Sequence, residues 1–371
     1  MARRHVELCR RFTPDEVCVS TVVATAESQA VDRAESYPIV RQPFTAVEAK
    51  ILVNQVRWSR SIDRWCRHGG GLVHLGNIRP CGYAVGLGTL LTATPYLIYV
   101  NGGDLLRERR FARQATRRWS GRRLYSRALG IVANSRWTAD LARDTLALFA
   151  ARPVPIAAID LGTDPGFFSP RRDTGALRRR LGLGDAPLLL TVARLVPHKG
   201  QDIALRALAA LAREFPDLRY LLVGDGHDHQ RLKALARDLG VADRVIFAGV
   251  LTDDEIAEAY ATATLYVGLS RIDNEVNAEG FGISFIEAAA SGVPAVAGDS
   301  GGVRSAVRDG ETGLVVPPTD VEAVTVAIRA LLTDHARRAA MGAAARRAAE
   351  THYHWDRVAR ETLDFARSLL A

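Results

Sequence analysis

The stretch RIDNEVNAEGFGISFIEAAASG, residues 271–292, decides how the rest of the chain is organised. Its two carboxylates, Glu279 and Glu287, flank a glycine-containing segment, and apolar residues follow at helical spacing until Gly292. A helix that opens on glycines offers free backbone N–H groups and the positive end of its dipole to phosphate or sugar oxygens. Carboxylates accept hydrogen bonds from hydroxyl groups. The stretch therefore predicts a site for an anionic, polyhydroxylated ligand, although a packed helix with solvated glutamates gives the same pattern.

Two further turns of the same half carry cations and glycines. Arg194 and Lys199 lie in the run ARLVPHKG, which follows a predicted strand and opens a predicted helix. Two cations beside a helix N-terminus can hold a diphosphate without a divalent metal. Gly224 and Gly226 end the next predicted strand, where a backbone can approach a ligand closely. Because ligands bind at the carboxyl ends of parallel strands, we expect all three turns to line one site.

Strands and helices alternate along both halves of the chain. The strands are predicted at 16–24, 37–40, 72–74, 96–100, 128–133, 188–193, 220–223, 245–247, 265–268, 295–297 and 314–316. This alternation predicts an α/β fold with parallel, doubly wound sheets. With 371 residues, the chain is long enough for two domains. We expect these domains at 1–165 and 166–350, and a final helix within 351–371 that packs back onto the first domain.

Positive charge is concentrated in the first half of the chain. The formal net charge is +8, and residues 1–150 carry 23 Lys and Arg against 12 Asp and Glu. Much of the excess lies in Arg107–Arg127, which reads RERRFARQATRRWSGRRLYSR. This segment predicts a surface for anionic lipid head groups or for an anionic acceptor, or else a solvated arginine-rich helix face. We expect no nucleic-acid partner, because no recognised binding motif accompanies the charge.

Cysteine usage and hydropathy indicate the compartment. The cysteines are Cys9, Cys18, Cys66 and Cys81. They include no Cys-x-x-Cys pair, which is typical of reduced cytosolic thiols. No secretory signal opens the sequence, and the most apolar run, 83–100, is interrupted by glycines and by Pro95. We therefore expect a cytoplasmic protein, either free or bound to the inner face of the cell membrane, and no iron, zinc or flavin cofactor.

Three runs together resemble a known family. They are RLVPHKG (194–200), VGDG (223–226) and EGFGISFIEAAASGVPAVAGDSGG (279–302). In this order they resemble the retaining glycosyltransferases of the large family 4, and the phosphatidylinositol mannoside mannosyltransferases and exopolysaccharide glycosyltransferases look most similar. The resemblance covers nearly the whole chain and is most specific over 155–316. It implies the GT-B fold, in which two Rossmann-like parallel-sheet domains face a cleft.

The resemblance implies a role for each residue of the predicted site. Arg194 and Lys199 would hold the donor diphosphate and stabilise the charge on the departing nucleotide. Glu287 would bind the ribose hydroxyls, and Glu279 would hold the transferred sugar. Glu279, Arg194 and Lys199 are thus the residues implied in catalysis. The remaining implied donor contacts are Gly224, Gly226, Val250, Phe281, Gly282 and Ile283.

The implied activity is hexosyl transfer with retention and without a bound metal. A nucleoside-diphosphate sugar would donate mannose or glucose to a lipid-linked or glycan acceptor. Two alternatives stay open. One is a catalytically silent homologue that holds a nucleotide sugar, and the other is a nucleotide-sugar 2-epimerase of the same fold.

The first domain departs from the family pattern twice. Family members begin with a strand and a glycine-rich loop, whereas this sequence begins at what resembles the following helix, at 3–8. A missing first strand and loop would leave the sheet with a gap or an uncovered edge; either the natural chain is longer or closure on the donor is impaired. Asn101 stands where the family has a histidine, and Asn cannot act as a base near neutral pH. Asp104 and His74 are acceptor-side candidates, although a plain turn also explains Asn101.

Overall fold

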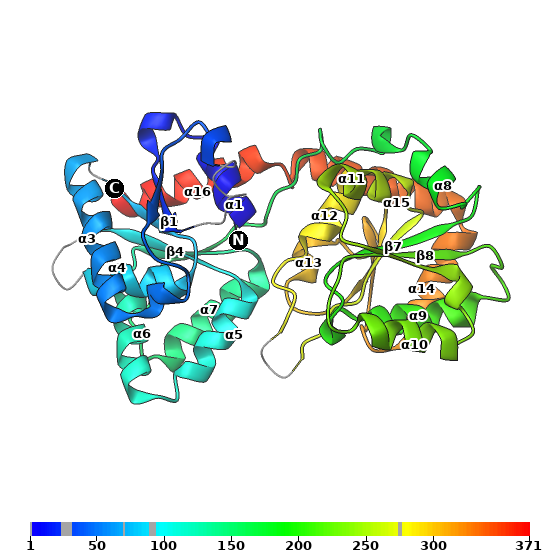
Figure 1. Cartoon of the computed structure of the whole chain (residues 1–371), viewed down its shortest axis with the longest axis horizontal. Helices are drawn as coiled ribbons and strands as arrows, with labels where there is room; N and C mark the ends of the chain where they lie inside the picture. The colour runs from blue at the N-terminus through cyan, green and yellow to red at the C-terminus, as the bar shows by residue number, and fades with distance from the viewer. Residues whose placement is uncertain (1, 24–31, 70, 89–93, 274–276) are drawn as a thin grey trace. The chain divides into compact units, whose positions relative to one another are not determined.

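The chain forms two compact units (Figure 1). The computed structural model describes residues 2–23, 32–69, 71–88, 94–273 and 277–371. Unit 1 comprises Met1–Ile159 together with Val358–Ala371, and unit 2 comprises Asp160–Arg357. The last helix, α16 (Trp355–Leu370), thus contributes most of its residues to unit 1.

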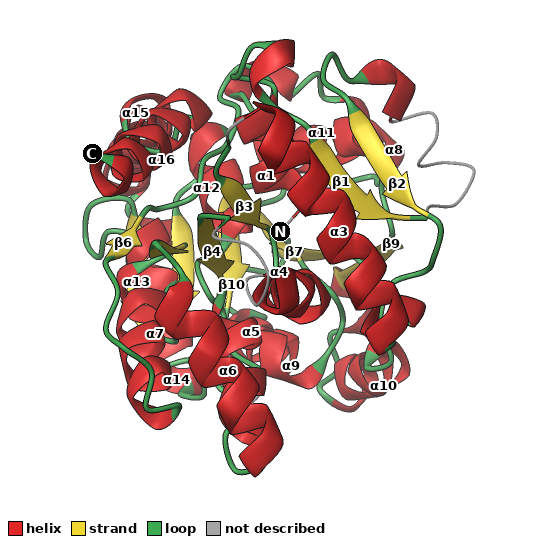
Figure 2. Ribbon diagram, turned by 90° about the vertical axis from the view of Figure 1, so that its left-hand side faces the viewer, coloured by secondary structure: helices red, strands yellow, loops and turns green. Residues whose placement is uncertain are grey.

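Unit 1 contains two parallel sheets in its described part (Figure 2). The smaller sheet pairs β1 (Val19–Val22) with β2 (Ile39–Gln42). The larger sheet has the strand order β3-β4-β5-β6, with bounds Val73–Leu75, Tyr96–Val100, Gly130–Ala133 and Ile156–Ala158. Apart from α16, the helices that the structure describes in unit 1 are α1 (Ala2–Cys9), α3 (Leu52–Gly69), α4 (Tyr83–Gly88), α5 (Gly102–Phe111), α6 (Ala115–Arg127) and α7 (Arg136–Leu148).

The larger sheet of unit 1 is covered on both faces. Alternate side chains of a strand point to opposite faces. Tyr96, Ile98 and Val100 of β4 join the core beneath the helices, and the Tyr96 hydroxyl donates to the Leu124 carbonyl of α6 at 2.6 Å. Tyr99 points to the other face, where its ring meets that of His5 of α1 at 4.7 Å. Burial on both faces explains why β4 reads as a continuous apolar run.

Two features of unit 1 bear on the predictions. Within the described residues, β1 pairs only with β2, and β3 pairs only with β4. The predicted absence of a first strand and loop stays a prediction. The basic segment Arg107–Arg127 is not one helix, because α5 ends at Phe111 and α6 begins at Ala115.

Unit 2 is built on a six-stranded parallel sheet. Its strand order is β12-β11-β10-β7-β8-β9. From β7 to β12 the bounds are Leu188–Val192, Arg219–Val223, Val245–Gly249, Leu265–Gly268, Ala295–Gly298 and Gly313–Val316. The helices are α8 (Ala176–Arg180), α9 (Gln201–Leu211), α10 (His229–Asp238), α11 (Asp253–Thr262), α12 (Ile283–Ala290), α13 (Val303–Ala306), α14 (Val321–Thr333) and α15 (His335–Thr351).

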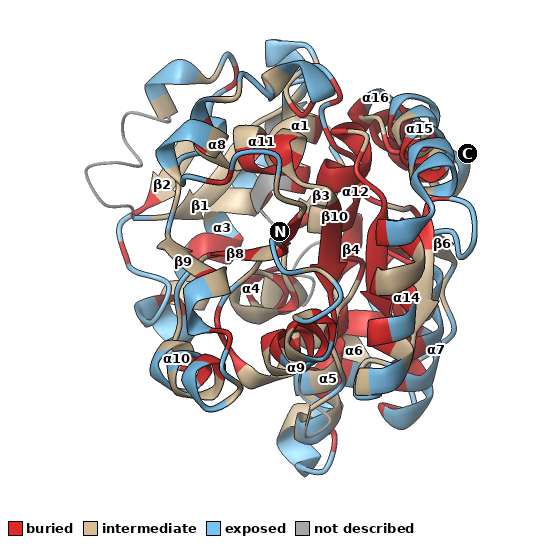
Figure 3. Ribbon diagram, turned by 90° about the vertical axis from the view of Figure 1, so that its right-hand side faces the viewer, coloured by how far each residue is buried: buried red, intermediate tan, exposed pale blue. Residues whose placement is uncertain are grey.

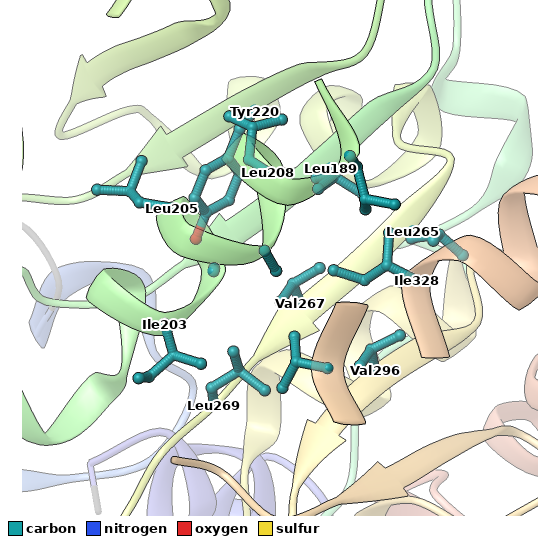
Figure 4. Packing of buried hydrophobic residues seen from close by; sticks show 14 of the residues in the cluster. Leu189, Ile203, Leu205, Leu208, Tyr220, Leu265, Val267, Leu269, Val296 and Ile328 are labelled. Atoms are coloured by element: carbon teal, nitrogen blue, oxygen red, sulfur yellow. The ribbon is translucent and has the colours of Figure 1, made fainter. Parts of the chain in front are cut away.

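Apolar strands hold unit 2 together. On one face, Leu189, Val267 and Val296 pack beneath α9 and α14 in one core cluster (Figure 4). On the other face, the Tyr266 ring of β10 meets Phe285 of α12 at 5.3 Å. Strands are buried, whereas outer helices such as α10 carry many exposed residues (Figure 3). The sheet is therefore doubly wound, as the alternating sequence pattern predicts.

The cysteines and the apolar helices are the two features on which the sequence prediction of compartment rests. All four cysteines are free thiols. None of the helices in the described segments combines the length and apolar character needed to cross a bilayer. In the apolar run 83–100, α4 ends at Gly88 and β4 begins at Tyr96, and positions 89–93 lie outside the described residues.

Candidate active site

Lys199 and Glu279 meet in unit 2, although 80 positions separate them in the sequence. Lys199 ends the short 3₁₀ turn after β7, and Glu279 lies in the loop before α12. The Lys199 Nζ is 2.7 Å from the Glu279 Oε2, and both side chains keep about a fifth of their surface exposed. The Ser270 hydroxyl, after β10, lies 3.4 Å from the same oxygen. A cation and a carboxylate thus share one place where a ligand can reach both.

Backbone hydrogen bonds hold these loops against each other. The Arg271 N–H donates to the His198 carbonyl at 2.8 Å, and the Arg271 guanidinium pairs with Asp202 of α9 at 3.1 Å. The Gly302 N–H donates to the Glu279 carbonyl at 2.8 Å. Gly301 has a φ of 59° and no room for a side chain, since a Cβ would lie 2.2 Å from that carbonyl. The position of Glu279 is therefore set by its neighbours' backbone.

Glu287 is held by a tyrosine that the sequence argument missed. It lies inside α12 with only 8% of its surface exposed. The Tyr260 hydroxyl of α11 donates to the Glu287 Oε2 at 3.0 Å. Burial, and then the nearby carboxylates of Glu279 and Glu287, raise the pKa of Tyr266. Both carboxylates therefore lie within electrostatic reach of the Tyr266 hydroxyl.

The turn that carries Lys199 is rich in positive charge. Arg194 is exposed, and its guanidinium makes no ion pair with any residue that the structure describes. Burial is the main cause that lowers the pKa of His198, and the nearby cations Lys199 and Arg194 lower it further. His198 is therefore neutral near pH 7, and the two cations supply the positive charge that an anionic ligand needs.

The glycines of the second turn have a packing role. A Cβ on Gly224 would lie 2.1 Å from the Ala193 carbonyl oxygen, and one on Gly226 would lie 2.2 Å from that of Leu195. These contacts bring the ends of β7 and β8 together. Both glycines therefore leave room for the neighbouring turn, and their predicted contact with the donor stays a prediction. Val250, 80% exposed, follows β9 at the same edge of the sheet.

The start of α12 offers backbone rather than side chains. Phe281 is 1% exposed and its ring packs 6.1 Å from that of Tyr353, so a ligand can meet only its main chain. Gly282 has a φ of 98°, and a Cβ there would lie 2.5 Å from the Phe285 ring. Ile283 is the first residue of the helix. Free N–H groups at this end suit an oxygen-rich ligand.

In unit 1, Asn101 and Asp104 lie together after β4. The Asn101 Nδ2 donates to the Asp104 Oδ2 at 3.2 Å, and the Arg107 guanidinium pairs with Asp104 at 2.6 Å. The Asn134 Nδ2, at the end of β5, donates to the Asn101 Oδ1 at 3.0 Å. Asn134 was not among the residues predicted from the sequence, although it follows β5 just as Asn101 follows β4.

His74 lies apart from this group. It is the middle residue of β3, and its Nδ1 is 2.7 Å from the Tyr99 hydroxyl. Burial lowers the pKa of His74 to about 4, so the imidazole is neutral near pH 7. In the described segments, no contact joins His74 to Asn101 or Asp104. The structure therefore places His74 in the packing between β4 and α1.

The parts of the chain that the structure describes contain no group of three or more His, Cys, Asp and Glu side chains that could hold a metal ion. The predicted metal independence stays a prediction. The charged side chains of this region of unit 2 are the pair of Lys199 with Glu279, exposed Arg194 and buried Glu287, and α12 begins at Ile283. This set suits a diphosphate at one end and hydroxyl groups at the other.

Comparison with known proteins now adds to this geometry. The family described as Glycosyl transferases group 1 matches residues 173–348. A GDP-mannose-dependent alpha-(1-6)-phosphatidylinositol monomannoside mannosyltransferase of Mycolicibacterium smegmatis is 42% identical over 220 residues, which are 58% of this chain and 58% of that protein. A D-inositol 3-phosphate glycosyltransferase of Acidothermus cellulolyticus is 37% identical over 68% of this chain and 57% of its own length. The chain thus spans a little over half the length of these relatives.

Solved structures show the same fold. HepE of Anabaena, solved in complex with UDP and glucose, has a TM-score of 0.79 at 20% sequence identity. The match covers 99% of this chain and 95% of the HepE chain. Sucrose-phosphate synthase from Thermosynechococcus elongatus has a TM-score of 0.73 at 21% identity, covering 95% and 99%. These likenesses confirm the predicted GT-B fold. The family match shows that residues 173–348 of this chain are a glycosyltransferase group 1 domain.

Proposed function

We propose that the chain transfers a hexose, with retention and without a bound metal, from a nucleoside-diphosphate sugar to a lipid-linked or glycan acceptor. The observation that carries this proposal is the 2.7 Å pair between Lys199 and Glu279. The pair and buried Glu287 belong to the same glycosyltransferase group 1 domain. One cation and two carboxylates then match one diphosphate, one hexose and one ribose.

The two cations would stabilise the negative charge that develops on the leaving group. When the bond between sugar and diphosphate breaks, negative charge grows on the departing phosphate oxygen. Lys199 and Arg194 would stabilise that charge from fixed positions, which lowers the barrier without reorganisation during the reaction. Glu279 pairs with Lys199 in this structure, so a bound diphosphate would share the ammonium group with this carboxylate. Glu279 would then be released to accept hydrogen bonds from the hexose hydroxyls.

The acceptor hydroxyl must also lose its proton. Asn101 cannot remove it, because an amide is not a base near neutral pH. The departing phosphate oxygen would take this proton while the acceptor oxygen bonds to the hexose on the face from which the diphosphate departs, which is consistent with retention. Asp104, held by Asn101 and Arg107, would orient an acceptor hydroxyl.

Mannose from GDP-mannose is the first donor to test. The name of the 42% identical Mycolicibacterium smegmatis relative includes GDP-mannose, whereas HepE was solved with UDP and glucose. The names of the relatives also indicate inositol-containing acceptors to test, namely phosphatidylinositol monomannoside and inositol 3-phosphate. Cytoplasmic placement and binding to an anionic membrane through Arg107–Arg127 are proposals as well.

A silent nucleotide-sugar-binding protein is the second candidate, and Asn101 in place of a histidine favours it. Both candidates predict that the donor binds, and only the first predicts turnover. The deciding experiment mixes the protein with GDP-mannose or UDP-glucose, with and without each acceptor, and measures nucleotide release and the sugar product. Acceptor-dependent release is the expected result. Donor binding without release would support the silent protein, and an acceptor-independent change of sugar configuration would support the epimerase. Absence of donor binding would overturn the proposal.

A further inference from the structure

Ser270 lies where the loops that carry Lys199 and Glu279 meet. It follows β10 by two positions and is only 4% exposed. Its hydroxyl donates toward the Glu279 Oε2 at 3.4 Å, and in the described segments this oxygen is its only hydrogen-bond partner. No role for Ser270 was predicted from the sequence, so its contact with a donor-side carboxylate calls for a physical account.

The backbone around Ser270 is closely packed on both sides. Leu269 is buried in the core of unit 2 (Figure 4), and its carbonyl oxygen would lie 2.1 Å from a Cβ on Gly200. The Ser270 carbonyl oxygen would lie 3.1 Å from a Cβ on Gly298, at the end of β11. Ser270 is therefore held between two neighbouring turns, and its hydroxyl is presented from a fixed backbone.

Two protein groups meet the same oxygen of Glu279. The Lys199 Nζ lies 2.7 Å from the Oε2, and the Ser270 hydroxyl approaches this same atom. Among the described residues the other oxygen, Oε1, has no hydrogen-bond partner. A carboxylate accepts hydrogen bonds through both of its oxygens. One oxygen of Glu279 is thus held by the protein, and the other is left for hydroxyl groups of a ligand.

The two contacts differ in length, and the difference has a cause. Hydrogen bonds between two oxygens are usually about 2.5–3.0 Å long, so the 3.4 Å contact of Ser270 is a long one. Lys199 makes the shorter, charge-assisted contact, which is the stronger of the two. In this structure the ammonium group therefore dominates the placement of the Glu279 carboxylate.

A diphosphate on Lys199 would change this balance. Phosphate oxygens compete with Glu279 for the same ammonium group, and the attraction between Lys199 and the carboxylate then weakens. A glutamate side chain has several rotamers and loses its direction unless a second contact holds it. The Ser270 hydroxyl is already beside the Oε2, and its contact can shorten as that of Lys199 lengthens.

We propose that Ser270 is the positioning residue that keeps Glu279 directed at the transferred hexose while the donor diphosphate is paired with Lys199. This inference rests on the proposed function and assigns a second support to its sugar-binding carboxylate. It separates two ligands. A nucleoside diphosphate uses the cations alone, whereas a nucleotide sugar also uses Glu279. Ser270 should therefore matter only for the nucleotide sugar.

Isothermal titration calorimetry of Ser270→Ala tests this separation. The ligands are GDP-mannose or UDP-glucose, whichever binds the wild-type protein more tightly, and the nucleoside diphosphate of the same base. The variant should bind the nucleotide sugar about tenfold more weakly, because a hydrogen bond to a charged acceptor is lost. Its affinity for the nucleoside diphosphate should stay at the wild-type level.

Three further variants exclude a merely structural role. Ser291→Ala is the matched control, since Ser291 is 3% exposed and its hydroxyl has no hydrogen-bond partner in the described part of the chain. It should leave both affinities unchanged. Ser270→Thr keeps the hydroxyl and should restore most of the affinity for the nucleotide sugar. The double variant of Ser270→Ala with Glu279→Ala should bind no more weakly than Glu279→Ala alone, because Ser270 acts through that carboxylate.

The outcomes that overturn the inference are distinct from a failure of the proposed function. Wild-type affinity of Ser270→Ala for the nucleotide sugar would show that this hydroxyl does not hold Glu279. Equal losses for the nucleotide sugar and the nucleoside diphosphate would show a structural role, as would an additional loss in the double variant. Circular dichroism checks that each variant is folded, and the double variant decides if Ser270→Thr is not. A wild-type protein that binds neither donor would overturn the proposed function, and this inference with it.

Discussion

The two units hold their polar groups by different means. In unit 2, the loops that carry Lys199 and Glu279 are joined by backbone contacts, such as the bond from the Gly302 N–H to the Glu279 carbonyl. In unit 1, Asn101 and Asp104 are held largely by other side chains. A backbone hydrogen bond does not depend on a side-chain rotamer, whereas a hydrogen bond between two side chains is lost when either one changes its rotamer. We therefore expect substitutions in unit 2 to have the larger and more localised effects.

The largest effect should come from Lys199→Ala. Loss of one fixed electrostatic stabiliser of a leaving group lowers turnover by about 10²–10³-fold. Asn101→Ala in unit 1 removes neutral hydrogen bonds and should lower turnover by roughly tenfold. Acceptor-dependent nucleotide release at saturating donor measures both. Equal losses in the two variants would remove the contrast between the units.

Gly301→Ala tests the backbone support of Glu279. The new Cβ would lie 2.2 Å from the Glu279 carbonyl, so the loop must move. We expect a loss of about 1–3 kcal/mol in the free energy of unfolding, the usual cost of overpacking, together with weaker donor binding. Gly310→Ala is the matched control, because Gly310 also has a positive φ, 75°, but no atom within 4 Å of the added Cβ. If both variants bind the donor equally well, the backbone does not position Glu279.

Tyr260→Phe removes one hydroxyl from beneath Glu287. Hydrogen bonds to charged groups contribute about 1.5–3 kcal/mol, so a less well oriented carboxylate should bind the donor about tenfold more weakly. Tyr220→Phe is the control, since this buried hydroxyl bonds Thr191 at 2.8 Å and has no contact with Glu287 in the described residues. It should lower stability but not donor affinity. Equal donor affinities for the two variants would show that Tyr260 does not position Glu287.

The smallest expected effect is the pH dependence of the stability of unit 1. Burial lowers the pKa of His74 to about 4 and that of His5 to about 3, against about 6.5 for an unfolded chain. The unfolded state therefore takes up protons first, so the stability of unit 1 is complete above about pH 6.5 and falls as the pH drops toward 4. Hydrogen exchange of the β4 amides at pH 7.5 and pH 5, corrected for intrinsic rates, measures it.

His74→Gln should reduce this pH dependence by roughly half, because His5 still titrates. His227→Gln, at an exposed position in unit 2, should leave the exchange of β4 unchanged. A pH dependence that persists in full in the His74 variant would show that this imidazole does not carry it.

Sequence alone predicted unit 2 better than unit 1, for a physical reason. Strand ends followed by Gly224 or by the Lys199 turn leave a pattern in the sequence, since glycine and helix starts are locally encoded. The apolar residues at helical spacing before Gly292 agree with α12. Tyr260 was missed because its contact with Glu287 joins two helices, and nothing local to either segment encodes it.

Side-chain direction limited the prediction for unit 1. His74 was expected at the ligand edge, yet alternation along β3 and β4 turns it toward Tyr99 and α1. Asn134 was missed because its partner Asn101 is on another strand. Strand type could be predicted, whereas the pairing that decides which side chains meet could not.

Donor affinity of the Glu287→Gln variant tests the central claim most directly. Isothermal titration calorimetry with GDP-mannose and with UDP-glucose identifies the donor that binds the wild-type protein, and the same donor is then titrated into the variant. If Glu287 accepts the ribose hydroxyls while Lys199 and Arg194 hold the diphosphate, the variant should bind at least about tenfold more weakly, since hydrogen bonds to a charged acceptor are lost. Equal affinity in wild type and variant would contradict the shared site.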